Sequence, residues 1–434
     1  MRKRVIAAAA LAATISLVAA GCSSSGSTSS ASGSTITYWA SNQGTSLAND
    51  KQVLTPVLDD FTKKTGVKVK LEVIGWNDLQ TRIQTAVTSG QGPDVLNIGN
   101  TWAASLQATG AFLPFGDSEM KAIGGSDKFV KTALDTGGAA GKTPTSVPLY
   151  GLAYGLYYNK KMFSDAGVQP PTNWGELVAD AKKLTNGTQY GFSLAAGSYT
   201  ENAHFAFINS AQNGGEWFDS KGNPTFTSSA NVDGIKRYLD LMQTDKVVNT
   251  SNAQYDNGVQ AVNDFATGKV AMILSQNNAD SSINANGMKS DAYGVVPFPA
   301  PAGGKPVASH VAGINLSIFK NTKNKDAALE FVKYMTSESV QSTLGKPYAT
   351  LPVLKGAKPN FTDNADEAAT FQKIYNEMSK PLPLVPAEDQ FENTVGKAMN
   401  AMFAKIATGG TVSGSDIKSA LQTAQDQVKQ SIGG

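Results

Sequence analysis

Three short segments of this sequence place a tryptophan beside hydroxyl or amide side chains. They contain Trp39, Ser41, Asn42 and Gln43; Trp76; and Asn100, Thr101 and Trp102. An indole ring stacks on the C–H face of a sugar, and hydroxyls and amides both donate and accept hydrogen bonds. These residue types are therefore suited to bind a neutral compound rich in hydroxyl groups. Core packing remains the alternative for Trp39, and capping of the next helix remains the alternative for Trp76.

The composition argues against most catalytic, metal-binding and nucleic-acid functions. One cysteine and two histidines cannot form an internal disulfide or a zinc site of the common kinds. The sequence contains no Gly-x-Ser-x-Gly, His-Glu-x-x-His or Walker motif. The chain has 37 lysines and arginines against 35 aspartates and glutamates, so it lacks the excess of basic residues that is typical of a nucleic-acid binder. We expect no enzyme activity, no cofactor, no bound metal and no nucleic-acid partner.

The first 34 residues predict export and attachment to a membrane. Arg2, Lys3 and Arg4 precede an apolar stretch over residues 5–20, as in a secretory signal. The following Ala19-Ala20-Gly21-Cys22 resembles a bacterial lipobox, which implies a signal peptide over residues 1–21 and lipidation of Cys22 at the outer face of the cell membrane. Ordinary signal-peptidase cleavage and free secretion are the alternative. Residues 22–34 are rich in Ser and Gly and predict a flexible tether.

Strand and helix patterns alternate beyond the tether. Apolar alternation predicts strands over 35–39, 67–74, 94–98, 155–158, 191–194, 270–274 and 314–319. Helical spacing predicts helices over 53–61, 79–87, 174–184, 205–212 and 232–242, and a mainly helical C-terminal part. This order predicts an α/β fold with mostly parallel sheets, whose ligands lie beyond the carboxyl ends of the strands. The three tryptophan segments follow the first three predicted strands.

Seven segments, in this order, resemble the family 1 extracellular solute-binding proteins of ABC importers, the group that includes maltose-binding protein. They are residues 61–69 (FTKKTGVKV), 92–95 (GPDV), 155–163 (GLYYNKKMF), 171–177 (PTNWGEL), 268–272 (GKVAM), 312–313 (AG) and 326–335 (DAALEFVKYM). The resemblance covers roughly Ile36 to the C-terminus. It implies two α/β lobes joined by a hinge, with the ligand cleft between them and closure on binding. It also implies ABC permease subunits as partners, and we expect a monomer.

The resemblance divides the chain at three crossings, near Tyr150, near 293–301 and near 337–348. Lobe 1 would comprise residues 35–149 and about 297–340, and lobe 2 residues 150–296 and about 341–434.

Further ligand candidates follow from the crossings and from family positions: Tyr150, Tyr154, Asn202, His204, Asn278, His310 and Phe391. Packing is the alternative for the tyrosines, and a structural role is the alternative for His204. Asn278 stands where many relatives carry a tryptophan that stacks on sugar, which implies a different arrangement of stacking rings. We expect structural roles for Asp94, Trp174, Trp217 and the pair Tyr157-Tyr158.

These observations predict a lipid-anchored receptor for a neutral carbohydrate, most simply a small oligosaccharide. Only Arg82 and Arg237 remain as arginines beyond the signal segment, which argues against an anionic ligand. A binder of the same fold for a polyol, a peptide or an ion is the alternative. A secreted carbohydrate-active enzyme and an adhesion lipoprotein are more distant rivals.

Overall fold

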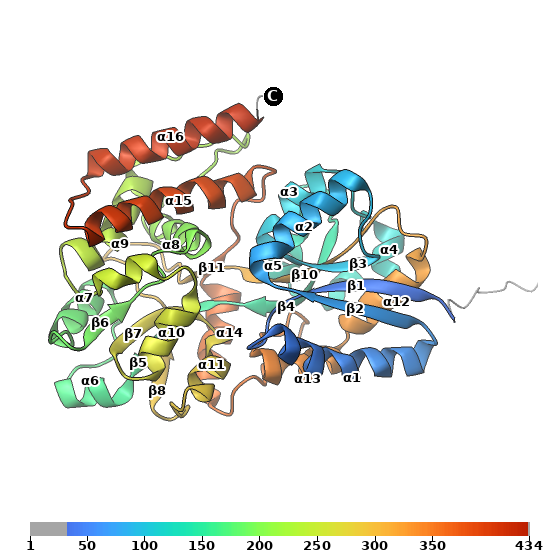
Figure 1. The fold of residues 1–434 in the computed structure, drawn as a ribbon, viewed down its shortest axis with the longest axis horizontal. Coiled ribbons are helices and arrows are strands. Elements are labelled where there is room, and N and C mark those ends of the chain that lie inside the picture. The colour runs from blue at the N-terminus through green and yellow to red at the C-terminus, as the bar shows by residue number, and fades with distance from the viewer. Residues whose placement is uncertain (1–32, 433–434) are drawn as a thin grey trace, which may run out of the picture.

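The computed structural model describes residues 33–432, apart from the side chain of Asn77. The predicted signal peptide, Cys22 and nearly all of the tether lie outside the described residues. Figure 1 shows two α/β lobes side by side, connected by segments that cross between them. Within residues 33–432, no helix combines the length and the apolar character that a membrane span requires.

Lobe 1 is built on a five-stranded sheet that two layers of helices cover. The strand order is β2 (Lys68–Ile74), β1 (Thr35–Ser41), β3 (Val95–Gly99), β10 (Ala312–Ile318) and β4 (Ser146–Leu152). The main helices are α1 (Leu47–Thr65), α2 (Trp76–Ser89), α12 (Lys325–Met335) and α13 (Glu338–Tyr348). Shorter ones are α3 (Ala103–Ala108), α4 (Asp117–Ala122), α5 (Lys131–Leu134), η1 (Asn100–Trp102), η2 (Ser126–Lys128) and η3 (Asp135–Gly137).

Alternation along β1 assigns its side chains to the two helical layers. Tyr38 is buried on one face, where its ring lies 5.0 Å from that of Phe331 in α12. Trp39 points to the opposite face and packs on the cluster of α2. Helix α1 begins after Ser46, whose hydroxyl accepts a hydrogen bond from Asn49 N, and it ends at Gly66 with φ 76°. The predicted helix end at Thr65-Gly66 is thereby confirmed.

Lobe 2 contains a four-stranded sheet and most of the C-terminal helices. The strand order is β6 (Tyr190–Ser193), β7 (Val270–Gln276), β5 (Tyr154–Asn159) and β8 (Tyr293–Val296). The larger helices are α8 (Tyr199–Gln212), α9 (Ser229–Gln243), α14 (Ala365–Glu377), α15 (Glu388–Ala407) and α16 (Gly414–Ile432). The others are α6 (Lys160–Ala166), α7 (Trp174–Lys183), α10 (Gly258–Ala266), α11 (Ala279–Ala285) and η4 (Thr250–Gln254). The short strands β9 (Ser309–His310) and β11 (Ser379–Lys380) pair between the lobes.

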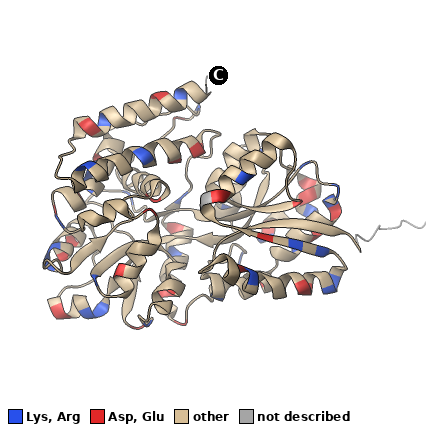
Figure 2. Ribbon diagram, viewed as in Figure 1, with Lys and Arg blue, Asp and Glu red and all other residues tan. Residues whose placement is uncertain are grey.

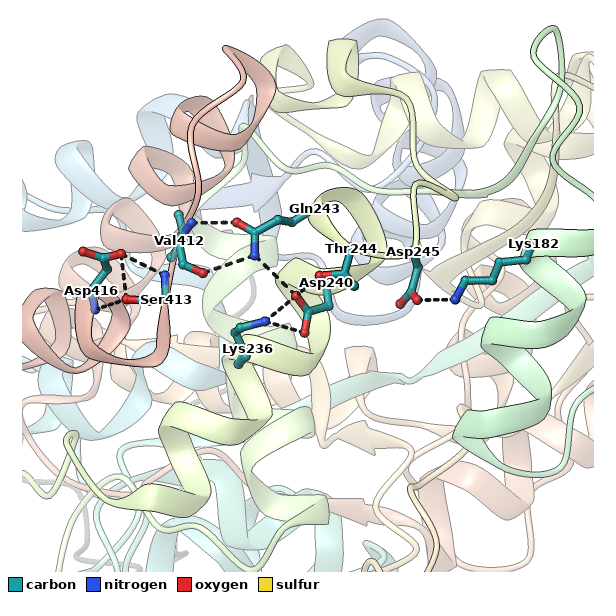
Figure 3. Close-up of polar contacts among 9 residues, drawn as sticks. All are labelled: Lys182, Lys236, Asp240, Gln243, Thr244, Asp245, Val412, Ser413 and Asp416. Atoms are coloured by element: carbon teal, nitrogen blue, oxygen red, sulfur yellow. Dashed lines mark hydrogen bonds and ion pairs between the residues drawn. The ribbon is translucent and has the colours of Figure 1, made fainter.

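The C-terminal helices are fastened to α9 by side-chain bonds to the backbone of the connection between α15 and α16. Gln243 accepts a hydrogen bond from Val412 N at 2.6 Å and donates one to Val412 O at 3.2 Å (Figure 3). Asp240 accepts hydrogen bonds from Lys236 one turn earlier in α9. Gln243, the last residue of α9, therefore fixes the position of the connection that joins α15 to α16.

The prediction of mostly parallel sheets is confirmed, with one strand in each sheet running the opposite way. In lobe 1, β1 pairs parallel with β2 and β3, but β10 is antiparallel to β3 and β4. In lobe 2, β6 and β7 are parallel, but β5 is antiparallel to β7 and β8. The physical reason is the crossing topology: β10 and β5 each start where the chain arrives from the other lobe. They therefore run opposite to the strands that end at the boundary.

Two of the three predicted crossings lie close to their predicted positions, and the third needs correction. The first passage lies at Ala153, between β4 and β5, so Tyr150 is inside β4. Residues 293–296 form strand β8, and the passage back to lobe 1 begins only after it. Residues 338–348 are not a crossing, because α13 packs on α1 and α12 of lobe 1 with its buried Val340 and Leu344. The next passage follows α13, before α14 packs on β5 and β8.

Candidate ligand site at the interlobe boundary

The carboxyl ends of strands from both lobes meet at the boundary, the side of each lobe that faces Ala153. Strand β7 ends at Gln276, opposite Tyr154, the residue that follows Ala153. Strand β3 ends at Gly99, opposite Ile314, close to the start of β10. Figure 1 shows the arrows of β1 and β2 pointing from lobe 1 toward lobe 2. The segments that follow β1, β2, β3, β6 and β7 therefore lie at this boundary, as the sequence predicted for its candidate residues.

Exposed aromatic rings stand at the starts of helices on this boundary. Trp76 is the first residue of α2 and is 37% exposed, and Tyr199 is the first residue of α8 and is 36% exposed. The ring of Trp102 meets that of Trp76 edge to face at 5.6 Å. Trp76 thus presents exposed ring surface in lobe 1. Tyr199, which was not a candidate, presents some in lobe 2, where Lys397 Nζ lies 5.9 Å from the centre of its ring.

A hollow of about 400 Å³ lies beside Trp76 on lobe 1. The first turns of α1 and α2 and the end of β2 form it, with Leu47, Val73, Ile74, Gly75, Asp78, Thr81 and Arg82 as its lining. Arg82 is held by Glu72 and lies 4.6 Å from the ring of Trp39. Because the guanidinium of Arg82 lies over the indole ring of Trp39, it covers that face of the ring.

The loop after β1 is organised by a buried carboxylate. Asp50 of α1 is fully buried and accepts hydrogen bonds from Asn42 Nδ2, Gln43 N and Gly44 N. Ser41 is also buried, and its hydroxyl accepts a hydrogen bond from Asn97. Ser41 and Asn42 thus shape the loop, while the side chain of Gln43 is half-buried and unengaged within the described residues.

The residues after β3 are partly covered by the chain itself. Asn100 is buried and donates a hydrogen bond from Nδ2 to Val311 O at 2.9 Å. The segment 381–384 closes over Asn100 and Thr101, and it leaves a cavity of about 10 Å³, close to the space of one water molecule. Asn100 therefore ties the end of β3 to the start of β10. Trp102 is the member of this group whose ring contacts Trp76. We call Trp76, Trp102 and Tyr199 the aromatic rim.

Four polar side chains from different segments contact one another near the boundary: Tyr154, His204, Glu392 and His310. The hydroxyl of Tyr154 lies 3.0 Å from His204 Nδ1, and His204 Nε2 lies 3.1 Å from Glu392 Oε1. The ring of His310 lies 4.1 Å from that of His204, and His310 Nδ1 has no hydrogen-bond partner among the described residues. Burial and the neighbouring His204 lower the pKa of His310, so this ring is neutral at physiological pH. The two histidines predicted separately are thus brought together.

Four of the predicted contact residues pack within the lobes: Phe391, Asn202 and Tyr150 are buried, and Trp39 is half-buried. Phe391 is fully buried, 4.8 Å from the ring of Trp217. Asn202 is fully buried and donates hydrogen bonds to Ala196 O and Asn400 Oδ1. Tyr150 is buried with its ring 6.1 Å from Tyr348, and Trp39 packs beneath Arg82 as described above. Packing between elements distant in sequence engages these four side chains, and their contact with a ligand stays a prediction. Asn278 is half-buried at the start of α11 and stays a candidate.

The predicted structural roles are confirmed. Asp94 accepts hydrogen bonds from Thr37 N at 2.7 Å and from Thr322 and Asn324. Trp174 packs on Phe298 and Trp217 on Phe226, and the pair Tyr157-Tyr158 packs on neighbouring aromatic rings.

Two residues that sequence reasoning passed over occupy the boundary with His204. Glu388 and Glu392 are four residues apart on α15, which contacts η1 and α3 of lobe 1. Their spacing on one helical face was the available signal, and it is common among solvent-exposed acids.

Comparison with known proteins places the chain in a clear context. Residues 44–342 match the family model described as bacterial extracellular solute-binding protein. The diacetylchitobiose-binding protein of Streptomyces coelicolor is 26% identical over 369 residues, which cover 83% of this chain and 82% of that protein. A probable amino-acid ABC transporter periplasmic-binding protein of Sinorhizobium fredii is 24% identical over 367 residues, which cover 82% and 83%. The GacH receptor of Streptomyces glaucescens, solved unliganded and with acarbose, superposes with a TM-score of 0.76 at 23% identity over 92% of this chain and 98% of that one.

Proposed function

The chain belongs to the bacterial extracellular solute-binding proteins of ABC importers, and from this premise we propose that it captures a small oligosaccharide between its two lobes. The observation that carries the proposal is the pair of exposed aromatic residues, Trp76 and Tyr199, at helix starts on the two sides of one boundary. Single exposed rings are common on protein surfaces, but two of them at helix starts on opposite sides of one boundary suit a ligand that contacts both lobes.

The energetics of this arrangement suit a sugar. Covering roughly 50 Å² of one ring with a sugar face contributes about 1 kcal/mol. Micromolar binding requires about 8 kcal/mol, so the rest must come from hydrogen bonds at the boundary. Gln43, Thr101 and Asn278 are half-buried there and can donate and accept them. Trp76, Trp102 and Tyr199 supply the stacking faces.

Closure of the lobes would couple binding to transport. A ligand that touches both lobes stabilises the arrangement in which they approach, and the permease then recognises that arrangement. Ala153, between β4 and β5, is the shortest connection and the natural pivot. We further propose that Cys22 carries the lipid anchor, that the protein acts as a monomer, and that it works at the outer face of the cell membrane.

Two relatives with known ligands support a carbohydrate: one is named for diacetylchitobiose and one was solved with acarbose. Another relative is named as an amino-acid transporter component, so the ligand class needs a direct test.

Isothermal titration calorimetry of the chain without residues 1–22 is that test. Mono-, di- and trisaccharides are compared with polyols, amino acids and short peptides. Micromolar or tighter binding of a saccharide, without turnover, supports the proposal. Binding of amino acids or peptides, without detectable binding of any sugar, would refute the carbohydrate assignment. For the anchor, a Cys22→Ala variant should move from the membrane fraction to the medium, and unchanged fractionation would refute lipidation at Cys22.

A further inference from the structure

The only two histidines of the chain lie against each other beside the passages between the lobes. Their ring centres are 4.1 Å apart, and the ring planes make an angle of 39°. His204 belongs to α8 of lobe 2. His310 ends β9, on the passage that leads from β8 of lobe 2 to β10 of lobe 1. The stacked pair therefore joins lobe 2 to a segment that crosses between the lobes.

The surroundings of His310 suit a neutral ring. His310 is 1% exposed, and its Nδ1 has no hydrogen-bond partner among the described residues. His204 differs, because its Nδ1 lies 3.0 Å from the Tyr154 hydroxyl and its Nε2 lies 3.1 Å from Glu392 Oε1. An imidazolium ring carries a proton on both nitrogens and needs an acceptor for each, and a buried charge without partners is costly. His310 therefore cannot become charged where it lies without a large penalty.

The chain supplies no counter-ion to His310. Within residues 33–432, no ion pair includes this ring, and Glu392 contacts His204 instead. The elements packed on β9 are α8, β5 and β11. Their titratable groups, with those of α9 and α15 around His204, are Tyr154, Glu201, Tyr238, Lys380, Glu388 and Glu392. Lys380, which pairs in register with His310, is bound to Glu216. Elsewhere Lys and Arg are interspersed with Asp and Glu over both lobes, so the groups nearest the pair dominate its protonation (Figure 2).

We propose that His310 is an acid-sensitive switch in the passages between the lobes: to take up a proton, its ring must leave His204, and β9 then loosens from α8. A charge on His204 would act in the same direction. Glu392 can stabilise a proton on His204, and the charged ring then repels a second charge at a separation of 4.1 Å. The switch does not depend on the identity of the ligand, so the unliganded chain can test it.

The direction of the pH dependence follows from the burial of the ring. Burial, and secondly the neighbouring His204, hold the pKa of His310 well below its usual range. At this ring the folded state binds fewer protons than the unfolded state, whose pKa is about 6.5. The stability that neutral His310 gives is therefore present above about pH 6.5 and is lost as the pH falls below it.

Proton–carbon NMR observes the two rings directly. The sample is the chain without residues 1–22, which keeps every described residue, purified without a histidine tag. It gives two histidine Cε1–H signals, which the variants His204→Gln and His310→Phe assign. The His310 signal should keep the shift of a neutral ring from pH 8 to about pH 5.5, where a solvated histidine is mostly protonated. A midpoint near pH 6.5 for this signal overturns the proposal.

Thermal unfolding from pH 8 to pH 5 measures the effect on stability. His310→Phe keeps a ring against His204 but cannot take up a proton, and the smaller His310→Asn replaces it if the phenyl ring does not fit. Because several buried acids also titrate, the quantity compared is the difference between parent and variant. Over this range the parent should lose about 2–4 °C more in melting temperature than the variant. Asp59→Asn, an exposed acid on α1, is the control and should follow the parent.

Hydrogen exchange locates the loosening. Ser309 N and Val311 N donate hydrogen bonds to Met378 O and Lys380 O, which join β9 to β11. After correction for the intrinsic pH dependence, these amides should exchange at least about 10-fold faster at pH 5 than at pH 8, relative to the amides of β6, and His310→Phe should abolish the difference.

Parallel melting profiles for the parent and the non-titrating variant overturn the proposal. So does exchange in β9 that quickens no more than exchange in β6. Neither result bears on the proposed function, because the measurements use no ligand.

Discussion

Asn277 of lobe 2 holds the backbone of Ala153, the residue at which the chain first passes between the lobes. Asn277 Oδ1 accepts a hydrogen bond from Ala153 N at 2.8 Å, and Nδ2 donates one to Ala349 O, on the later passage. Both passages are thus tied to one fully buried side chain. These two hydrogen bonds fix the position of the first passage relative to the later one.

Replacing Asn277 by Ala should destabilise the protein. Ala153 N and Ala349 O would both be left buried without partners, at a cost of about 1–3 kcal/mol each. Urea unfolding at pH 7 measures the change in the free energy of unfolding. The adjacent Asn278→Ala removes an amide of the same size from a half-buried position and should cost under about 1 kcal/mol. Equal losses for the two variants would contradict the assigned role.

Trp76→Ala tests the aromatic rim. Because the ring is 37% exposed and also packs on Trp102, its removal should lower the free energy of unfolding by about 1–3 kcal/mol and leave the protein folded. Loss of a stacking face should weaken binding of the sugar identified by calorimetry about 5- to 30-fold, from about 1–2 kcal/mol of lost burial. Ile432→Ala, an exposed apolar residue at the end of α16, is the control. Unchanged affinity in Trp76→Ala would remove this ring from the site.

Asp94→Asn should lower stability in a pH-dependent way. Burial alone would raise the pKa of Asp94, but hydrogen bonds from Thr322, Thr37 and Asn324 outweigh it and lower the pKa. A lowered pKa in the folded state gives stability that is present above the unfolded pKa of about 4 and is lost as the pH falls below it.

Urea unfolding from pH 7 to pH 3 checks this expectation. Asp94→Asn should be less stable than the parent by about 1–3 kcal/mol at pH 7, and the difference should narrow below about pH 4. Asp59→Asn, on the exposed face of α1, serves as the control. A gap that stays constant across this range would show that the charge of Asp94 is not involved.

The contribution of Glu367 to stability should depend on pH in the opposite direction to that of Asp94. Burial, and secondly the charge of Asp280, raise the pKa of Glu367 to about 8. The folded state holds this proton more tightly than the unfolded state, so the stability it gives is full below about pH 4.5 and declines as the pH rises to about 8.

Glu367→Gln should therefore flatten the stability profile between pH 5 and pH 8. At pH 8 the variant should exceed the parent by a few kcal/mol, since one pKa unit corresponds to about 1.4 kcal/mol. The melting temperature as a function of pH measures this, with exposed Glu377→Gln on the same helix as control. Parallel profiles for parent and variant would contradict the assignment.

Gly396→Ala should disturb the start of α8. A Cβ at position 396 would lie 1.9 Å from Tyr199 O, so α15 and α8 could not keep their present approach. We expect a loss of about 1–3 kcal/mol in the free energy of unfolding and weaker ligand binding, because Tyr199 would be displaced. Gly414→Ala, whose added Cβ would meet its nearest atom at 3.9 Å, should be tolerated. Tolerance of both substitutions would refute the close contact.

Local pattern was sufficient to predict β1, β2, β3, β5, β6, β7 and β10 and the alternation of strands with helices, but not β4, β8 or the short strands β9 and β11. Alternation along β1 and β2, and the Thr65-Gly66 end of α1, depend on neighbouring residues, and the structure confirms them. The segments after β1, β2 and β3 were predicted as boundary segments, because strand ends and helix starts are also local features. Strand direction was not local: β10 and β5 are antiparallel because of the crossings.

Tertiary structure alone decided which candidates face the boundary. Phe391 and Glu388 are three residues apart on α15, yet the phenyl ring packs on Trp217 inside lobe 2, and the carboxyl group of Glu388 is buried beside Glu392. An acid in the first turn of a helix is ordinarily solvated and favoured by the helix dipole, so nothing near Glu388 in sequence predicts its burial. That burial arises because α15 docks on α8 and reaches η1 of lobe 1, elements that lie almost two hundred residues or more away along the chain.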